Sequence, residues 1–187
     1  MPALFTAKTL TFLRAIARHN DREWFKAHKD AFATDVQAPL HALIDRLAID
    51  FQAFAPDLAC SPRESTFRQY RDTRFSEDKS PLKTHIAAFF PARQLAKGEG
   101  AGLYVQIDRK EVWIGGGLYH PPSPVLQAVR THIAANLQHL RAIVESPAFK
   151  RRIGPVSGDT LTRVPRGFDA AHPAAAYLKH KDLVVMK

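Results

Sequence analysis

Apolar residues in the first third of the chain recur at helical spacing and are interrupted by polar capping residues. Thr6 precedes the first apolar stripe and Asp21 the second, so two short amphipathic helices are predicted, the first ending near residues 19–20. Beyond Pro39, which predicts either a kink or a new helix start, the period continues until Pro56. The stripe of the first predicted helix consists of Leu10, Leu13, Ile16 and Ala17.

The pattern then changes to short extended runs separated by polar segments. Residues 67–70 are strand-like, and residues 71–80 are polar and irregular. Ser80 followed by Pro81 is a cap and first-turn signal that predicts a helix or turn starting there. Residues 102–108 and 111–115 alternate as strands do and predict a β-hairpin without a glycine at its tip.

The last third predicts more helix and a final strand. Ser123 with Pro124 opens a helix whose apolar stripe reaches residue 144, with a break around Asn136. A further helix follows Pro173, and residues 183–185 are strand-like. The chain is therefore predicted to be one α+β domain over residues 1–187, with helices packed on a small, mainly antiparallel sheet.

Charge and composition add a preference for anionic partners. Lysine and arginine number 27 against 18 acidic residues, a net charge of +9, which favours polyanions through long-range attraction. The basic residues form no long run, so a solvated surface explains them equally well. A single cysteine, Cys60, excludes an intrachain disulfide, and the start of the chain lacks the features of a secretory signal. The apolar runs are too short for a membrane span, so we expect a cytoplasmic protein without a membrane partner.

The densest candidate for chemistry is the segment 67–85. Its cations, beside the predicted helix start at Ser80, suit a phosphate or carboxylate ligand. Asp72, Glu77 and Asp78 offer the opposite interpretation, a structural network of ion pairs that holds an irregular loop. The cations are Arg68, Arg71, Arg74, Lys79 and Lys83.

A glycine run, Gly115, Gly116 and Gly117, is predicted to end a strand, where it would let a phosphate approach the backbone. It matches neither the dinucleotide nor the P-loop pattern, and glycines also mark bulges or close crossings of chain segments. Tyr119 and His120 beside the run could line a pocket, although a half-buried aromatic is the more ordinary role.

Three weaker patterns are assigned ordinary roles. Ser80 and Lys83 have the spacing of serine–lysine acyl-transfer sites, but helix capping explains the serine better. His132 and His139 are too far apart for a helical zinc pair, and no metal site is predicted. Asp21 is expected as a cap and Trp24 as core.

Four segments together resemble the conserved hypothetical family called domain of unknown function 2461. They are residues 20–29, 70–85, 113–119 and 167–173, and they span most of the chain. The resemblance implies a small mixed α/β protein and names no reaction or cofactor. It points to a shared surface made by Arg71, Asp72, Arg74, Lys79, Lys83 and His85 with Gly115, Gly116, Gly117 and Tyr119. Members of the family continue past the last strand with a helical stretch, which leaves open a missing C-terminal extension.

The leading hypothesis is a binder of, or enzyme on, a phosphorylated or carboxylated small molecule, in which the 70–85 loop meets the glycine-ended strand. Arg71, Arg74 and Lys83 would grip the anion, and Asp72 or His85 would act as acid or base. The first alternative is a nucleic-acid-binding module. Its stacking residues would be Tyr70, Tyr119 or Trp113. The second alternative is a structural or protein-interaction domain whose loop charges neutralise one another.

Overall fold

The computed structural model describes residues 3–74, 76–95 and 99–187. The chain divides into two compact units. Unit 1 comprises Met1–Phe90 and Tyr104–Trp113, and unit 2 comprises Pro91–Leu103 and Ile114–Lys187. The four strands follow the order β1-β2-β3-β4 in an antiparallel sheet, which confirms the α+β class. The expectation of a single domain stays a prediction.

Unit 1 begins with helices at the predicted positions. Thr6 caps α1 (Ala7–Arg18) and Asp21 caps α2 (Arg22–Ala27), as the sequence indicated. The next helical elements run without a break: α3 (Lys29–Phe32), a π-helical turn η1 (Ala33–Gln37) and α4 (Ala38–Phe54). Pro39 lies in the first turn of α4, so it marks a fresh helix start, and the π-turn absorbs the irregularity before it.

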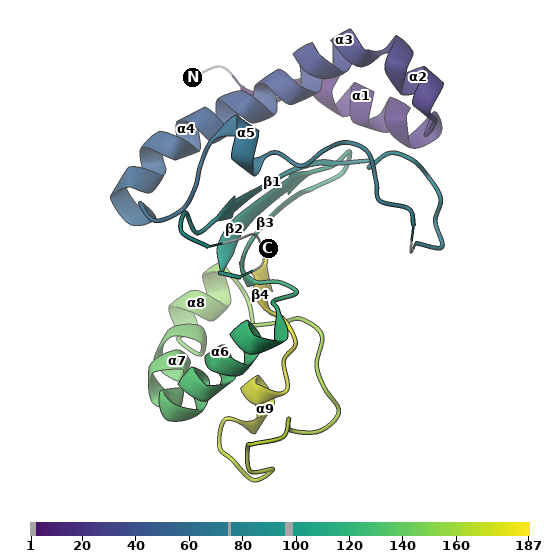
Figure 1. Cartoon of the computed structure of the whole chain (residues 1–187). Helices are drawn as coiled ribbons and strands as arrows, with labels where there is room; N and C mark the ends of the chain where they lie inside the picture. The colour runs from purple at the N-terminus through teal and green to yellow at the C-terminus, as the bar shows by residue number, and fades with distance from the viewer. Residues whose placement is uncertain (1–2, 75, 96–98) are drawn as a thin grey trace. The chain divides into compact units, whose positions relative to one another are not determined.

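The core of unit 1 is built from these helices and strand β1 (Ile86–Pro91), above which α4 lies in Figure 1. The rings of Phe51 in α4 and Phe90 in β1 meet edge to face, with centroids 5.1 Å apart. Trp24, expected in the core, is only half-buried. A short helix, α5 (Pro62–Ser65), capped by Ser61, was not predicted. The side chains with no exposed surface include Leu13, Ile16, Val36, Ile44 and Leu82.

The predicted hairpin is confirmed as β2 (Gly102–Ile107) and β3 (Val112–Leu118). Its tip needs no glycine because the carboxylate of Asp108 accepts hydrogen bonds from the backbone N–H groups of Lys110 (2.6 Å) and Glu111 (3.0 Å). Strand β3 is longer than expected, so the glycine run lies inside the strand and not at its end.

Unit 2 packs its helices around a second core. α6 (Ser123–Ala135) and α7 (Leu137–Val144) follow one another with the predicted break at Asn136. α8 (Pro147–Arg152), capped by Ser146, was not predicted, whereas α9 (Ala175–Leu178) and β4 (Leu183–Met186) were. Figure 1 shows α6 beside both α7 and α9. The buried centre of this core is Ile133, Leu137, Ala174 and Leu178.

Candidate functional site

Two extended segments of unit 1 bring the charged part of the sequence together. Tyr70 and Leu82 form an antiparallel bridge, the N–H of Arg71 donates to the carbonyl of Pro81, and the N–H of Lys83 donates to Gln69 (both 2.9 Å). Of residues 67–70, which were expected to be strand-like, only Tyr70 forms a β-bridge, and no strand is assigned to this segment. The segment between them, residues 72–80, is called the charged loop below.

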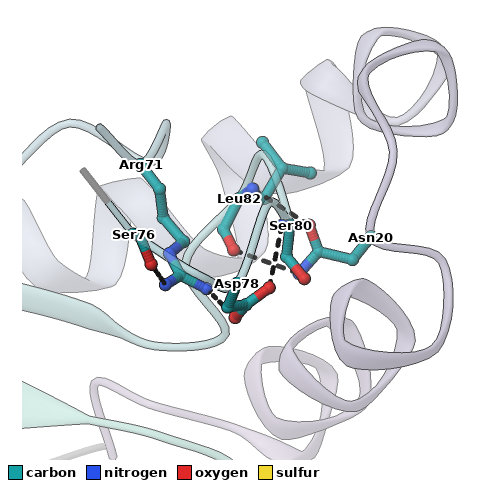
Figure 2. A network of polar contacts seen from close by, with 6 residues as sticks. All are labelled: Asn20, Arg71, Ser76, Asp78, Ser80 and Leu82. Atoms are coloured by element: carbon teal, nitrogen blue, oxygen red, sulfur yellow. Dashed lines mark hydrogen bonds and ion pairs between the residues drawn. The ribbon is translucent and has the colours of Figure 1, made fainter. Parts of the chain in front are cut away.

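The prediction that a helix or turn starts at Ser80 and Pro81 is wrong, because neither is found there. Leu82 instead forms a β-bridge, and both its backbone N–H and its carbonyl are hydrogen-bonded to the Asn20 side chain. The Leu82 N–H donates to Asn20 Oδ1 at 2.9 Å, and Asn20 Nδ2 donates to the Leu82 carbonyl at 3.0 Å (Figure 2). These long-range partners satisfy backbone groups that a helix would otherwise have bonded. Without a helix, Ser80 and Lys83 also lose the spacing of a serine–lysine nucleophile.

A second side-chain amide, that of Gln69, supports the same pair of segments. Gln69 is 8% exposed, and its Nε2 donates to the carbonyl of Lys83 and, at 3.4 Å, to that of His85. The side chains of Asn20 and Gln69 are thus hydrogen-bonded to the backbone of Leu82, Lys83 and His85. Sequence reasoning missed both residues, because their partners lie far along the chain.

Arg71, immediately before the charged loop, forms an ion pair with Asp78 and donates to the Ser76 hydroxyl at 3.3 Å (Figure 2). Asp78 Oδ1 also accepts from the backbone N–H of Ser80 at 2.8 Å. Hydrogen bonds from the Ser80 hydroxyl and N–H, and then the Arg71 guanidinium, lower the pKa of Asp78. The carboxylate is therefore fixed in its charged form beside Arg71.

Arg74 is engaged in a second, exposed pair. Its Nη2 lies 2.8 Å from Asp72 Oδ2, and its Nε donates to Asp72 Oδ1 at 3.0 Å. These side-chain bonds, with a further one from the Arg74 backbone, lower the pKa of Asp72 to about 2. Lys79 donates to the carbonyl of Thr73 at 3.0 Å. The network of ion pairs that the sequence offered as the alternative therefore exists, and it accounts for most of the loop's charges.

Lys83, which follows the charged loop, is not part of this network. It is half-buried, and it forms no ion pair with a carboxylate anywhere in the part of the chain that the structure describes. Its ammonium lies 4.7 Å from the centre of the Phe67 ring. Burial, and then the charge of Arg68, lower the pKa of Lys83. A cation in this position lacks both full hydration and a counter-ion.

Lys83 forms part of the wall of an open hollow of about 500 Å³ within unit 1. His85 lines the same hollow, and burial, followed by the charges of Lys83 and Arg71, lowers its pKa, while Asp108 acts in the opposite direction. Arg74, Lys79 and Arg68 are not part of the lining. The lining residues are Ala17, Asn20, Arg71, Asp72, Asp78, Ser80, Leu82, Lys83, Thr84 and His85.

The glycine run lies in unit 2. Neighbouring backbone atoms leave no room for a side chain at Gly115 or Gly117. A Cβ on Gly115 would lie 2.6 Å from the Val185 carbonyl oxygen, and one on Gly117 would lie 2.1 Å from that of Leu183. Both neighbours belong to β4, which pairs with β3 in antiparallel register. Close strand crossing, the alternative that the sequence left open, thus explains these glycines without a ligand.

The other aromatic and metal candidates are dispersed. Tyr70 is 42% exposed and packs edge to face on Phe25, and the Trp113 indole donates to Glu111 at 2.9 Å. Tyr119 stacks on His120, with centroids 4.1 Å apart. Across the described ranges, no group of three or more His, Cys, Asp or Glu residues is arranged to hold a metal ion. Nor is any helix among those residues long and apolar enough to cross a membrane.

Residues 8–187 match the model of the family described as Conserved hypothetical protein (DUF2461). The chain belongs to this family. The match covers both the charged loop and strand β3 with its glycine run. The resemblance drawn from the four sequence segments is therefore confirmed for nearly the whole chain. No curated protein and no solved structure is significantly similar to this DUF2461 chain.

Proposed function

We propose that unit 1 of this DUF2461 protein binds a small phosphorylated or carboxylated molecule in the hollow beside Lys83. The observation that carries the proposal is that Lys83 is half-buried and without an ion-pair partner, while Arg71 and Arg74 are paired with Asp78 and Asp72. A bound anion would supply the missing counter-charge at a site where water is already partly excluded.

The two carboxylates in the lining do not oppose an anion as strongly as their number suggests. Asp78 is neutralised by Arg71, and Asp72 by Arg74, with Arg68 Nη2 a further 3.9 Å from Asp72. The three arginines and the two aspartates together carry a net charge of +1, and Lys83 adds another positive charge. The ligand contacts proposed here are therefore Lys83, Ser80 and the free donor positions of Arg71, with Arg74 and Lys79 acting only at longer range.

His85 is the better acid–base candidate of the two predicted residues. Its lowered pKa keeps the imidazole neutral near pH 7, so it can accept a proton. Asp72, with a pKa of about 2, is a weak base at that pH. We therefore propose binding as the function and give His85 the only proton-transfer role should the ligand be a substrate.

The test is a thermal-shift screen of wild type, Lys83→Met and Lys79→Met against sulfate, inorganic phosphate, nucleotides, sugar phosphates and dicarboxylates. Methionine keeps the apolar stem against Phe67 and removes the charge. Lys79→Met is the matched control, since it removes one charge from the same segment but not from the hollow. A ligand at ten times its Kd stabilises the native state by about 1.4 kcal/mol, or a few degrees in a chain of this size.

We expect at least one small anion to raise the midpoint of wild type and Lys79→Met, and to lose that effect in Lys83→Met. Equal loss in both variants would mean that general charge, and not the hollow, attracts the anion. If no compound raises the melting temperature of the folded protein, the proposal is overturned and the ion pairs of this segment have a structural role.

Nucleic acid is the second candidate, favoured by the net charge of +9. Short single strands belong in the same screen at low and high salt. Binding through many phosphates weakens steeply as salt rises, whereas binding of one small anion in the hollow weakens much less. A rise in melting temperature that a single-stranded nucleic acid causes, that disappears at high salt and that is the same in both variants would support this alternative.

A further inference from the structure

Asp182, immediately before β4 in unit 2, is a buried carboxylate held on both oxygens. It is 2% exposed. Its Oδ1 accepts from the backbone N–H of His120 at 2.7 Å, and its Oδ2 accepts from that of Asp159 at 3.3 Å. Three segments far apart in the sequence are thereby fixed to one side chain.

His120 is held by the same carboxylate in an unusual conformation. Among the described residues it is the one non-glycine residue with positive φ, at 46°. Few residues adopt this region without local compensation, and the bond from its N–H to Asp182 supplies it. The conformation also turns the imidazole toward Asp182, with Nδ1 2.9 Å from Oδ1.

The partners of Asp182 determine the tautomer of His120. An ionised carboxylate only accepts hydrogen bonds, and both oxygens here already accept from backbone N–H groups. Nδ1 of His120 is therefore the donor, which leaves the lone pair on Nε2. The His120 side chain is 65% exposed, and one ring face is covered by Tyr119, the planes lying 16° apart. The ring is thus fixed along one edge and one face.

We propose that His120 is a reactive imidazole whose Nε2 attacks an electrophilic acyl or phosphoryl group, with Asp182 as its positioning residue. The Nε2 lone pair forms a bond to the acyl carbon or phosphorus, and the bond to the leaving group breaks with its electron pair going to that group. The Nδ1 proton stays between the ring and Asp182, whose negative charge balances the cationic ring. Water then cleaves the new N–C or N–P bond and releases the acid.

A purely structural role for Asp182 would fix both the chain and the tautomer at His120, but it would not require an unusual reactivity. The tautomer is a condition that the proposal must meet, and the reactivity separates the two roles. The first experiment is therefore nitrogen NMR of the histidine side chains in the native protein at slightly alkaline pH. We expect His120 to carry its proton on Nδ1. A proton on Nε2 would overturn the proposal without any mutation.

The second experiment measures reactivity. Diethyl pyrocarbonate serves as the acyl probe and phosphoramidate as the phosphoryl probe, and peptide mass spectrometry follows each histidine separately. His132 and His139, which are exposed on α6 and α7, are internal references in the same molecule. We expect His120 to react roughly tenfold faster than either with at least one probe, by analogy with the effect of carboxylate partners on metal-binding histidines. The two probes distinguish an acyl from a phosphoryl preference.

Asp182→Asn removes the charge and keeps the shape, and its single amide oxygen retains only one of the two backbone N–H donors. We expect it to reduce the His120 rate toward that of His132, with an unchanged circular dichroism spectrum as evidence of a folded chain. An unchanged His120 rate in this variant, or equal rates in wild type, would overturn the proposal. None of these residues lines the hollow of unit 1, so the outcome is independent of the anion site.

Discussion

The hydroxyl of Thr9 in α1 donates a hydrogen bond of 2.6 Å to the backbone carbonyl of Asp35 in the π-turn. Pro39, four residues after Asp35, has no N–H to give to that carbonyl. The same hydroxyl accepts from the N–H of Thr6, 3.3 Å away, and Thr9 has no exposed surface. One buried side chain thus completes the cap of α1 and satisfies the irregular turn before α4.

Thr9→Val should therefore destabilise the protein well beyond its change in shape. Valine has nearly the same volume but leaves the Asp35 carbonyl and the Thr6 N–H without this partner, at a cost of about 1–3 kcal/mol. Chemical denaturation measures the change. Thr131→Val is the control, since Thr131 is exposed and donates to Gln127 of its own helix, so it should change the free energy of unfolding by less than about 0.5 kcal/mol. Equal effects of the two substitutions would contradict the role given to Thr9.

Asn20→Ala should loosen the segment that carries Lys83. It removes the hydrogen bonds to the backbone N–H and carbonyl of Leu82, a residue whose side chain is fully buried. We expect the free energy of unfolding to fall by about 1–3 kcal/mol. Hydrogen exchange of the Leu82 amide should accelerate more than that of amides in α6. Asn136→Ala, which removes a bond within a helix end, is the matched control. Unaltered exchange at Leu82 would mean that the strand pairing alone holds this segment.

Gly117→Ala should be among the most damaging single substitutions in unit 2. It combines a φ of +131° with a contact of 2.1 Å to the Leu183 carbonyl, a backbone atom that cannot move aside cheaply. Gly167→Ala separates the two costs, because Gly167 has a φ of +91° but nothing within 4 Å. We expect about 1–2 kcal/mol for Gly167→Ala from the backbone alone, and clearly more for Gly117→Ala. Similar melting temperatures for the two variants would argue against close packing by β4.

The lowered pKa of His85 predicts a specific pH dependence of stability. The unfolded chain binds the proton first, near the ordinary value of about 6.5, so the folded state loses stability as pH falls through that value toward the folded pKa. His85→Gln should remove this loss. We therefore expect the melting temperature of wild type to fall more than that of the variant between about pH 7.5 and about pH 5.5. Parallel curves would contradict the lowered pKa.

The same histidine gives sulfate binding a pH dependence of the opposite sense. An anion in the hollow favours the imidazolium, so binding takes up a proton and the sulfate affinity of wild type should rise as pH falls over this range. Sulfate is chosen because it does not titrate there. Calorimetry in buffers of different ionisation enthalpy measures the proton uptake, which should vanish in His85→Gln. Binding without proton uptake would move the anion away from His85.

Local signals in the sequence predicted most of the elements correctly. Thr6 and Asp21 cap their helices because a short polar side chain satisfies the N–H groups of the turn next to it. The missed elements are α5, α8 and β1. The two helices are short, and each has only a serine cap and a proline to indicate it. Strand β1 is almost continuously buried, so it lacks the alternation that indicates a strand. The hairpin tip was located without a glycine, and Asp108 accounts for its turn.

The charged loop shows where local reasoning failed. Arg71 and Lys83, both predicted for the anion site, do line one hollow. The sequence predicted Arg74 and Lys79 for the same site, but neither lines the hollow. Their different roles depend on which carboxylate each cation meets. The glycines and Tyr119 belong to unit 2, and the packing of β4 explains the glycines.

By itself, the sequence determined the family, the α+β class and the positions of most helices and strands, because capping, periodicity and turn chemistry act between neighbouring residues. Only the tertiary structure decided that Ser80 starts no helix, that Lys83 alone among the cations in the lining has no carboxylate partner in the described part of the chain, and that Asp182 fixes His120. The physical reason is distance along the chain. Asn20 meets Leu82, and His120 meets Asp182, each across 62 residues, and no local pattern encodes such a partner.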